Sequence, residues 1–284
     1  MCIRDRMYLT DRQVPYARGL LRSLESPEDK AVAQPAEFQG GVSLILKALR
    51  GSSTPVTVFA TGSLRDVAAA FNREPELLRT KVARLYVNAG HSGGQREWNV
   101  DLDRHAFVRI MQSGLPICWV PCFGPKRYAS LWKFRHREVL ATAPMPFQNF
   151  FIYALLKKPP AELDPVEALT SGLKAAEKDA VWNAERNMWC TAAFFHAAGR
   201  TLVKTRDRGW VAVRERVATR PTTSPAVVSF EKLRIRIDAD GTTRIDPTNG
   251  NVEILTFCRD EGQTYDEAMR DALRNLFLDM AHRP

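Results

Sequence analysis

Hydrophobic and polar residues in the first third of the chain follow helical and strand periods in turn. Apolar residues recur every three or four positions over residues 40–49, which predicts a helix. The β-branched run Val56–Ala60 lies between chain-breaking residues and predicts a buried strand. Ser63 precedes a second helical pattern and is expected to cap it, and Pro75 is placed to open a short third helix. Residues 82–87 form the next apolar run, so this region predicts a right-handed crossover between two parallel strands.

The alternation of helix and strand patterns continues beyond this crossover. Residues 104–113 have helical spacing, and residues 115–120 form another strand pattern. Two further helices are predicted at 147–156 and 164–178. The chain therefore repeats its strand, turn and helix order before the pattern changes.

The C-terminal part has strand-like alternation followed by one helix. Strands are predicted at 227–230 and 233–237, and Asp240-Gly241 is a turn signal that makes a β-hairpin. Residues 265–280 carry apolar side chains on one face and predict an amphipathic terminal helix. All these elements predict an α/β fold, an open and mostly parallel sheet flanked by helices, with a C-terminal β-hairpin and helix.

Size and composition narrow the class of protein. With 284 residues and 45% hydrophobic content, the chain predicts one domain over residues 1–284, and the second methionine, Met7, suggests that residues 1–6 are not native sequence. No apolar run approaches the roughly 18 residues that cross a bilayer, and the N-terminus has no signal-peptide core, so no membrane partner is expected. Five scattered cysteines favour reduced thiols and a cytoplasmic location. The net charge of +9 is modest for this length.

Polar residues gather where the predicted parallel strands end. Thr61-Gly62 follows the first strand, Asn88 begins the loop after the second, and Glu97-Trp98-Asn99 lies farther along that loop. Ligands of open parallel sheets bind beyond the carboxyl ends of the strands. We therefore expect the ligand site among these loops.

The segments V-T-V-F-A-T-G-S-L-R-D-V-A, E-P-E, Y-V-N-A-G and E-W-N-V-x-x-D occur in this order. Their order and spacing resemble the pattern of the inosine-uridine nucleoside hydrolase family. The resemblance implies an enzyme that cleaves the N-glycosidic bond of a small-molecule nucleoside to ribose and free base. It also implies that the Thr61 carbonyl binds calcium, that Asn88 lines the ribose pocket, and that Glu97 and Asn99 hold ribose hydroxyls. Asp103 is expected to cap the helix that begins near Arg104.

His196 has two interpretations. By resemblance it is the catalytic histidine that assists the leaving base, although Ala197 stands where the family has a metal-binding aspartate. Alternatively it is a core histidine that is hydrogen-bonded beside Phe194 and Phe195. The sequence leaves both readings open.

The family's opening motif, D-x-D-x-x-x-D-D, does not occur in this sequence. By resemblance it would supply most calcium ligands and the carboxylate that activates water. Its absence predicts a chain that is inactive as it stands, either as a fragment without the first strand or as a divergent member that binds without hydrolysis. Calcium is doubtful for the same reason.

The segment 126–137 combines basic and aromatic residues without an acidic residue. One interpretation is a lid in which Trp132 packs on the base of the nucleoside. The alternative is a non-catalytic nucleoside or ribose binder, or a single-stranded nucleic-acid binder that stacks bases on these aromatics. The sequence does not decide base preference or whether the chain forms a homo-oligomer.

Overall fold

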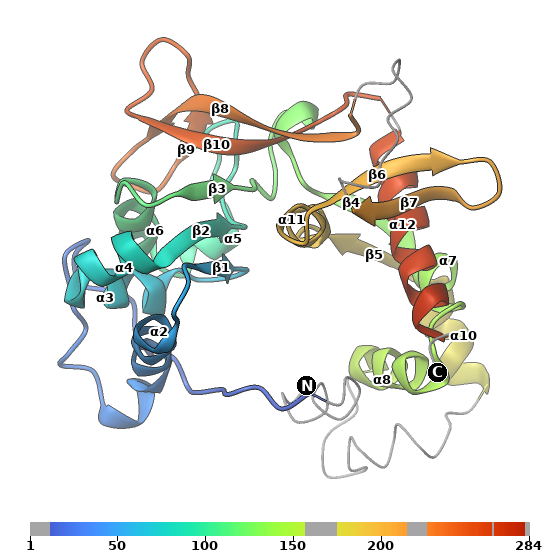
Figure 1. The fold of residues 1–284 in the computed structure, drawn as a ribbon, viewed down its shortest axis with the longest axis horizontal. Helices are drawn as coiled ribbons and strands as arrows, with labels where there is room; N and C mark the ends of the chain where they lie inside the picture. The colour runs from blue at the N-terminus through green and yellow to red at the C-terminus, as the bar shows by residue number, and fades with distance from the viewer. Residues whose placement is uncertain (1–11, 157–174, 215–225, 263, 282–284) are drawn as a thin grey trace.

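The computed structural model describes residues 12–156, 175–214, 226–262 and 264–281. A six-stranded sheet with the order β1-β2-β3-β10-β8-β9 organises the fold (Figure 1). The pairs β1/β2, β2/β3 and β3/β10 are parallel, whereas β10/β8 and β8/β9 are antiparallel. The strands are β1 (Val56–Ala60), β2 (Val82–Val87), β3 (Ile117–Trp119), β8 (Val228–Ile237), β9 (Thr243–Ile245) and β10 (Val252–Arg259). The predicted α/β class and the parallel crossover are confirmed.

The helix before β1 and the helices that connect β1, β2 and β3 pack on one face of the sheet. They are α2 (Gly40–Gly51), α3 (Arg65–Arg73), α4 (Pro75–Lys81), α5 (Trp98–Asp101) and α6 (Arg104–Met111). Pro75 opens α4 as expected, and Asp103 caps α6 because its Oδ1 accepts the Ala106 N–H at 3.0 Å. Ser63 lies one residue before the N-cap position of α3, which Leu64 occupies, and its Oγ accepts the N–H of Arg65, the first residue of the helix, at 3.3 Å.

Alternate residues of each strand face two separate hydrophobic cores. Leu85 and Val87 of β2 belong to the core under α2, α3 and α6, whereas Tyr86 between them belongs to the opposite core. In β3, Ile117 faces the first core and Cys118 the second. This follows from the two-residue period of a strand, and it makes the sheet the shared wall of both cores.

The second core is covered by elements that form the right-hand half of Figure 1. These elements comprise two antiparallel strand pairs. Strand β4 (Trp132–Arg135) pairs with β5 (Glu185–Met188), and β6 (Arg200–Thr205) forms a hairpin with β7 (Gly209–Arg214). The helices of this half are α7 (His136–Leu140), α8 (Met145–Leu156), α10 (Ala175–Asn183), α11 (Thr191–Ala197) and α12 (Thr264–Ala281). Two 3₁₀ turns lie elsewhere along the chain, Ala36–Phe38 before α2 and Lys126–Tyr128 before β4. No helix in the described ranges is long and apolar enough to cross a membrane.

Several predicted elements differ in extent from the observed ones. The strand expected at 115–120 is only the three-residue β3, and the two strands expected at 227–230 and 233–237 are one continuous strand, β8. The β8/β9 hairpin and the terminal helix are confirmed. Most of the helix expected at 164–178 lies outside the described residues, as do residues 1–6.

The N-terminal segment 12–35, called the strap below, crosses α3 and α6 without regular structure of its own. Arg65 and Asp103 form a nearly buried ion pair of 3.2 Å that holds it. Arg65 donates to the carbonyls of Leu20 and Leu21, and the Asp103 carboxylate accepts the Leu24 N–H at 2.8 Å. The strap's backbone groups therefore find partners in side chains instead of a neighbouring strand.

Candidate functional site

Asn88 is the buried centre of a polar cluster at the carboxyl end of β2. Its side-chain amide donates to the Val120 carbonyl at 2.8 Å, and its backbone N–H donates to the Ala60 carbonyl at 2.9 Å. The Asn99 amide donates to the Asn88 carbonyl at 3.3 Å. The loops after β1, β2 and β3 and the start of α5 therefore meet at Asn88.

Glu97 joins this cluster through Gly90. The Oε2 of Glu97 accepts the Gly90 N–H at 2.8 Å, and the Glu97 side chain is almost wholly buried. Gly90 has φ of 93°, and a Cβ there would meet Thr243, Phe107 and Trp119 at 3.2–3.3 Å. Glycine adopts this left-handed backbone conformation without steric cost, which explains why a glycine follows Asn88-Ala89 in the loop.

Thr61 lies at the same edge, because Ala60 of β1 is paired with Val87 of β2. Its side chain is exposed. The structure thus brings Thr61, Asn88, Glu97 and Asn99 to one end of adjacent strands, as the sequence predicted. Their roles toward a ligand stay predictions.

Two thiols that sequence reasoning missed flank Asn88. The Cys190 thiol contacts the Asn88 Oδ1, and the Cys122 Sγ lies 3.8 Å from the Asn88 Nδ2 and 3.9 Å from the Asn99 Nδ2. Burial raises the pKa of Cys190 to about 11 and raises the pKa of Cys122 further, so both thiols are protonated at neutral pH. The two residues are far apart in sequence, so their spacing gave no signal.

The donors of this cluster do not fit calcium. Ca²⁺ takes six to eight oxygen ligands, commonly several carboxylates. Around Asn88 the described donors are amides, two protonated thiols and the single carboxylate of Glu97, which already accepts a backbone N–H. In the part of the chain that the structure describes, no group of three or more His, Cys, Asp and Glu side chains could hold a metal ion.

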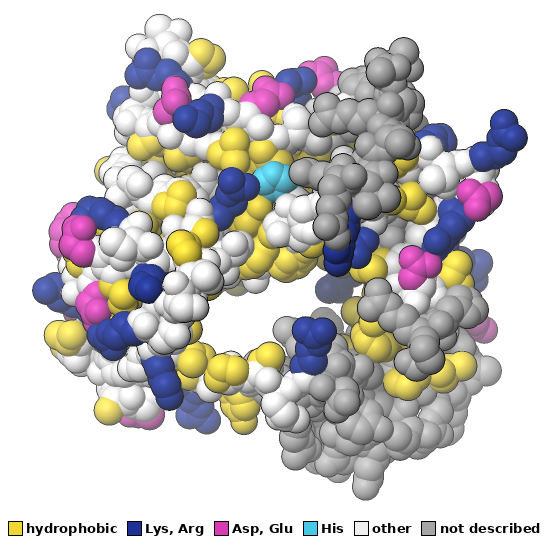
Figure 2. Space-filling model, viewed as in Figure 1, with side chains coloured by type: hydrophobic (Ala, Val, Ile, Leu, Met, Phe, Trp, Pro, Cys, Tyr) yellow, Lys and Arg dark blue, Asp and Glu magenta, His cyan; other side chains and the backbone are white. Residues whose placement is uncertain are grey.

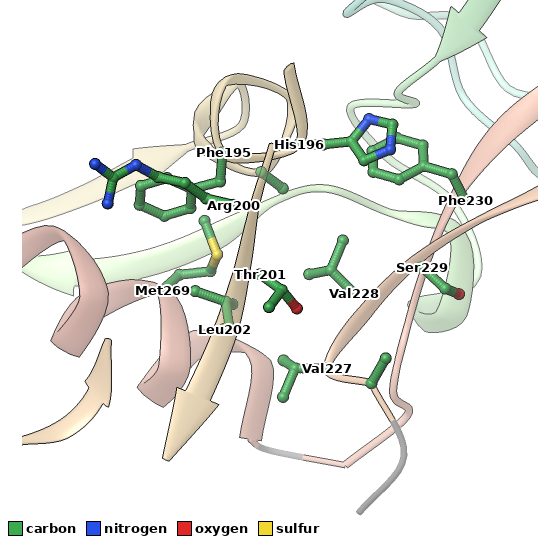
Figure 3. A pocket seen from close by; sticks show the side chains of 12 residues that line it. Phe195, His196, Arg200, Thr201, Leu202, Val227, Val228, Ser229, Phe230 and Met269 are labelled. Carbon is green, nitrogen blue, oxygen red and sulfur yellow. The ribbon is translucent and has the colours of Figure 1, made fainter. Parts of the chain in front are cut away.

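His196 of α11 lies near the carboxyl ends of β1 and β2, on the sheet face that belongs to the second core. Its Nδ1 is 2.7 Å from the hydroxyl of Tyr86, and its ring stacks on Phe230 with centroids 3.9 Å apart. Figure 3 shows the two stacked rings at one side of a pocket of about 240 Å³, with Met269 and Leu202 at the other side. The environment is that of a hydrogen-bonded histidine among aromatic rings, although the partners are Tyr86 and Phe230 instead of Phe195. The catalytic role of His196 stays a prediction.

Trp132 is fully buried, which corrects the expected lid. The segment 126–137 folds into a 3₁₀ turn, β4 and the start of α7, and β4 alternates buried aromatic and exposed basic residues. The Trp132 ring stacks on Phe134 at a centroid distance of 4.8 Å inside the second core. Because the indole has no exposed surface, it presents no face to a base in this arrangement.

The same burial gives no support to stacking of nucleic-acid bases on this segment. Two of its basic residues are also paired, Lys133 with Glu185 at 3.0 Å and Arg127 with Glu231 at 2.9 Å. On the face drawn in Figure 2, Lys and Arg side chains are spread out and interspersed with Asp and Glu. Strand alternation of the Trp-Lys-Phe-Arg sequence was the available signal for this burial.

His91 is a second titratable residue that the sequence reasoning passed over. It follows Gly90 in the Asn88 loop, and its Nδ1 accepts the Gly93 N–H at 3.0 Å. Burial lowers the pKa of the imidazole below its ordinary value, and this effect outweighs the opposing influence of the nearby Glu97 carboxylate. His91 therefore favours the neutral form beside the polar cluster.

The fold is that of an α/β protein in which a polar cluster lies beyond the carboxyl ends of the parallel strands, where ligands of such sheets commonly bind. The chain belongs to the inosine-uridine preferring nucleoside hydrolase family, whose sequence model matches residues 7–256. Members of this family generally depend on a metal ion.

Curated relatives are similar to the chain over one short stretch. The pyrimidine-specific ribonucleoside hydrolase RihA of Salmonella schwarzengrund is 40% identical over 81 residues, and RihA of Enterobacter sp. is 42% identical over 81 residues. Each stretch covers 27% of this chain and 26% of the relative. The similarity therefore spans about a quarter of those relatives.

The fold as a whole is similar to that of a plant nucleoside hydrolase, PpNRh1. Its structure superimposes with a TM-score of 0.50 and 12% sequence identity, and the alignment covers 96% of this chain and 85% of the plant protein. This likeness confirms the mostly parallel α/β architecture.

Proposed function

We propose that the chain binds a ribonucleoside through its ribose at the carboxyl end of β1, β2 and β3. The observation that carries the proposal is the meeting of Asn88, Glu97 and Asn99 at one sheet edge. A ribose diol needs partners that both donate and accept hydrogen bonds. The Glu97 carboxylate supplies acceptors, and the Asn99 amide supplies a donor and an acceptor.

The reaction in the family's name, hydrolysis of a nucleoside, is the activity that we propose for the protein to which this chain belongs. For the chain as described we propose that it binds a ribonucleoside without hydrolysing it. N-glycosidic cleavage needs an activated water, and the donors around Asn88 do not fit a divalent metal that would lower the pKa of this water. We derive no catalytic step through calcium.

Four free cysteines among the described residues support the proposed cytoplasmic location. Cys118, Cys122 and Cys258 are buried and Cys190 is half-buried. Thiols in this state persist in a reducing compartment.

The test is a calorimetric titration of D-ribose and uridine into the full chain and its Glu97→Gln variant. We expect Glu97→Gln to weaken ribose affinity by about tenfold, because it replaces one charged acceptor with a neutral one, a change of ~1.4 kcal/mol. The Gly90 N–H keeps an acceptor in the variant, so the melting temperature should change little. Glu76→Gln is the control, since Glu76 is an exposed glutamate of α4. Equal affinity in the wild type and Glu97→Gln, or no ribose binding, rejects the proposal.

Turnover is measured separately by release of ribose from uridine and inosine with added calcium. We expect ribose binding without release of free ribose. Rapid, calcium-dependent release of ribose would contradict the proposal that the chain binds without hydrolysis. It would leave the proposed ribose site standing.

A further inference from the structure

We infer that Thr243 of β9 is a positioning residue for the proposed ribose site, because its hydroxyl holds the loop that carries Asn88 and Gly90. The inference rests on the proposed function and deepens it by naming a residue outside the site on which binding depends. The loop, residues 88–94, is called the β2 loop below. Thr243 lies 152 residues beyond His91, its partner in this loop, and β3, β10 and β8 lie between β2 and β9 in the sheet.

Strand β9 contacts the β2 loop through its backbone and through one side chain. The fully buried Thr243 donates its hydroxyl hydrogen to the His91 carbonyl at 3.1 Å. The Gly94 N–H donates to the Thr243 carbonyl at 2.8 Å, and the Ile245 N–H donates to the Ser92 carbonyl at 3.2 Å. The loop therefore covers the outer edge of β9 and is attached to it at three points.

Gly90 is the residue of the β2 loop that contacts the carboxylate we assign to the ribose. Its N–H donates to the Glu97 carboxylate at 2.8 Å, and its φ is 93°. Glycine has little backbone preference of its own, so the direction of this N–H depends on the contacts of the neighbouring residues. Without a restraint on both sides of Gly90, the Glu97 carboxylate would lose its fixed direction.

Two side chains hold the carbonyls on either side of Gly90. The indole N–H of Trp119 donates to the Ala89 carbonyl at 2.8 Å, and the Thr243 hydroxyl donates to the His91 carbonyl. A Cβ at Gly90 would lie 3.2 Å from the Thr243 Oγ1, so the hydroxyl also packs against Gly90. Trp119 belongs to the first core, whereas the Thr243 hydroxyl can be removed with little change in volume. Thr243 is thus the restraint that can be tested without emptying the core.

The experiment is a calorimetric titration of D-ribose into the wild-type chain and into Thr243→Val, Thr243→Ser and Thr256→Val. Valine has nearly the shape of threonine and lacks the hydroxyl, whereas serine keeps it. Thr256 is the matched control, because it is also fully buried and its hydroxyl donates to a backbone carbonyl, that of Ile254, at 3.2 Å. That bond lies within β10 instead of between a strand and the β2 loop.

We expect Thr243→Val to weaken ribose binding by about fivefold, since one hydrogen bond that restrains the loop is lost. The backbone bonds between β9 and the loop remain in this variant, so the chain should fold. Thr243→Ser should restore the affinity to within about twofold of the wild type. The two valine variants should lower the melting temperature by similar amounts, and Thr256→Val should leave ribose affinity unchanged.

A double-mutant cycle with Glu97→Gln tests the route through Gly90. If Thr243 acts by fixing the Glu97 carboxylate, the loss of affinity in the Thr243→Val and Glu97→Gln double variant should be smaller than the product of the two single losses. Losses that multiply would mean that the two residues act independently, which rejects this route.

The remaining outcomes are equally decisive. Normal ribose affinity in Thr243→Val, or an equal loss in Thr256→Val, would reject the positioning role and leave the ribose site standing. Should Thr243→Val fail to fold, Thr243→Ala removes the same hydroxyl without placing a methyl group against the loop, and the same loss of affinity is expected. Failure of the wild-type chain to bind ribose would reject the proposed function together with the inference.

Discussion

Two polar clusters share the same two segments of the chain and have different surroundings. Strand β2 contributes Tyr86 to one cluster and, just past its end, Asn88 to the other. The segment at α11 contributes His196 to the first and Cys190 to the second. The Tyr86–His196 pair lies over the sheet among Phe59, Phe194 and Phe230, whereas Asn88 lies where β1 and β3 also end and their loops begin.

The comparison shows that position along a strand decides what a polar residue can do. Tyr86 is buried and its hydroxyl is hydrogen-bonded to His196, which is half-buried and lines the pocket of Figure 3. A residue past the strand end is surrounded by backbone groups of several loops, which can be aimed at a ligand. We propose binding at the Asn88 cluster and expect the Tyr86–His196 hydrogen bond to stabilise the fold.

The largest effect is expected from Asn88→Ala. The change removes a buried amide and leaves the Val120 carbonyl and the Cys190 thiol without their partner. We expect the free energy of unfolding, measured by urea denaturation, to fall by about 2 kcal/mol and ribose binding to be lost. Asn249→Ala, at an exposed turn, is the control and should be neutral. An Asn88→Ala variant with normal ribose affinity would contradict the proposal that ribose binds at the Asn88 cluster.

Tyr86→Phe should have a moderate effect on stability and none on binding. It removes the hydroxyl that is hydrogen-bonded to the His196 Nδ1, so the free energy of unfolding should fall by about 1 kcal/mol. Tyr16→Phe, an exposed tyrosine of the strap, is the matched control. Loss of ribose affinity in Tyr86→Phe would place the ligand at the pocket beside His196 and reverse our assignment.

The smallest expected effect is on the pH dependence of stability, through His91 beside the Asn88 cluster. Because burial lowers the pKa of His91 from its ordinary value of 6.5, the folded chain binds this proton less readily than the unfolded chain. The stability that His91 contributes is therefore present above pH 6.5 and is lost as the pH falls below it. We expect His91→Gln to reduce the decline of the melting temperature between neutral and mildly acidic pH. His105→Gln, at an exposed histidine, should retain the full decline.

Local patterns were sufficient for the first crossover and insufficient for the middle of the sheet. Val56–Ala60 and 82–87 could be predicted because breakers and caps mark their ends. Strand β10 was not predicted, since it is defined by pairing with β3 and β8, and β3 lies more than a hundred residues earlier in the chain. Pairing between such distant segments leaves no period in a single stretch of sequence.

The residues of the candidate site were also predictable from the sequence only in part. Asn88, Glu97 and Asn99 could be proposed because each follows a recognisable strand or opens a helix. Cys190 could not, because it approaches Asn88 only through the packing of α11 against the sheet, and Cys122, although it follows β3, is a residue type that gave no signal for this site. Their contact depends on tertiary structure that the residue types do not encode locally.

The Asp103 carboxylate has a further consequence. One oxygen caps α6, and the other accepts the Leu24 N–H of the strap and the Arg65 Nε. α6 begins shortly after the turn that carries Glu97 and Asn99. A single buried carboxylate thus ties the strap to the start of α6, close to α5, so we expect a change that loosens one of these contacts to disturb the other.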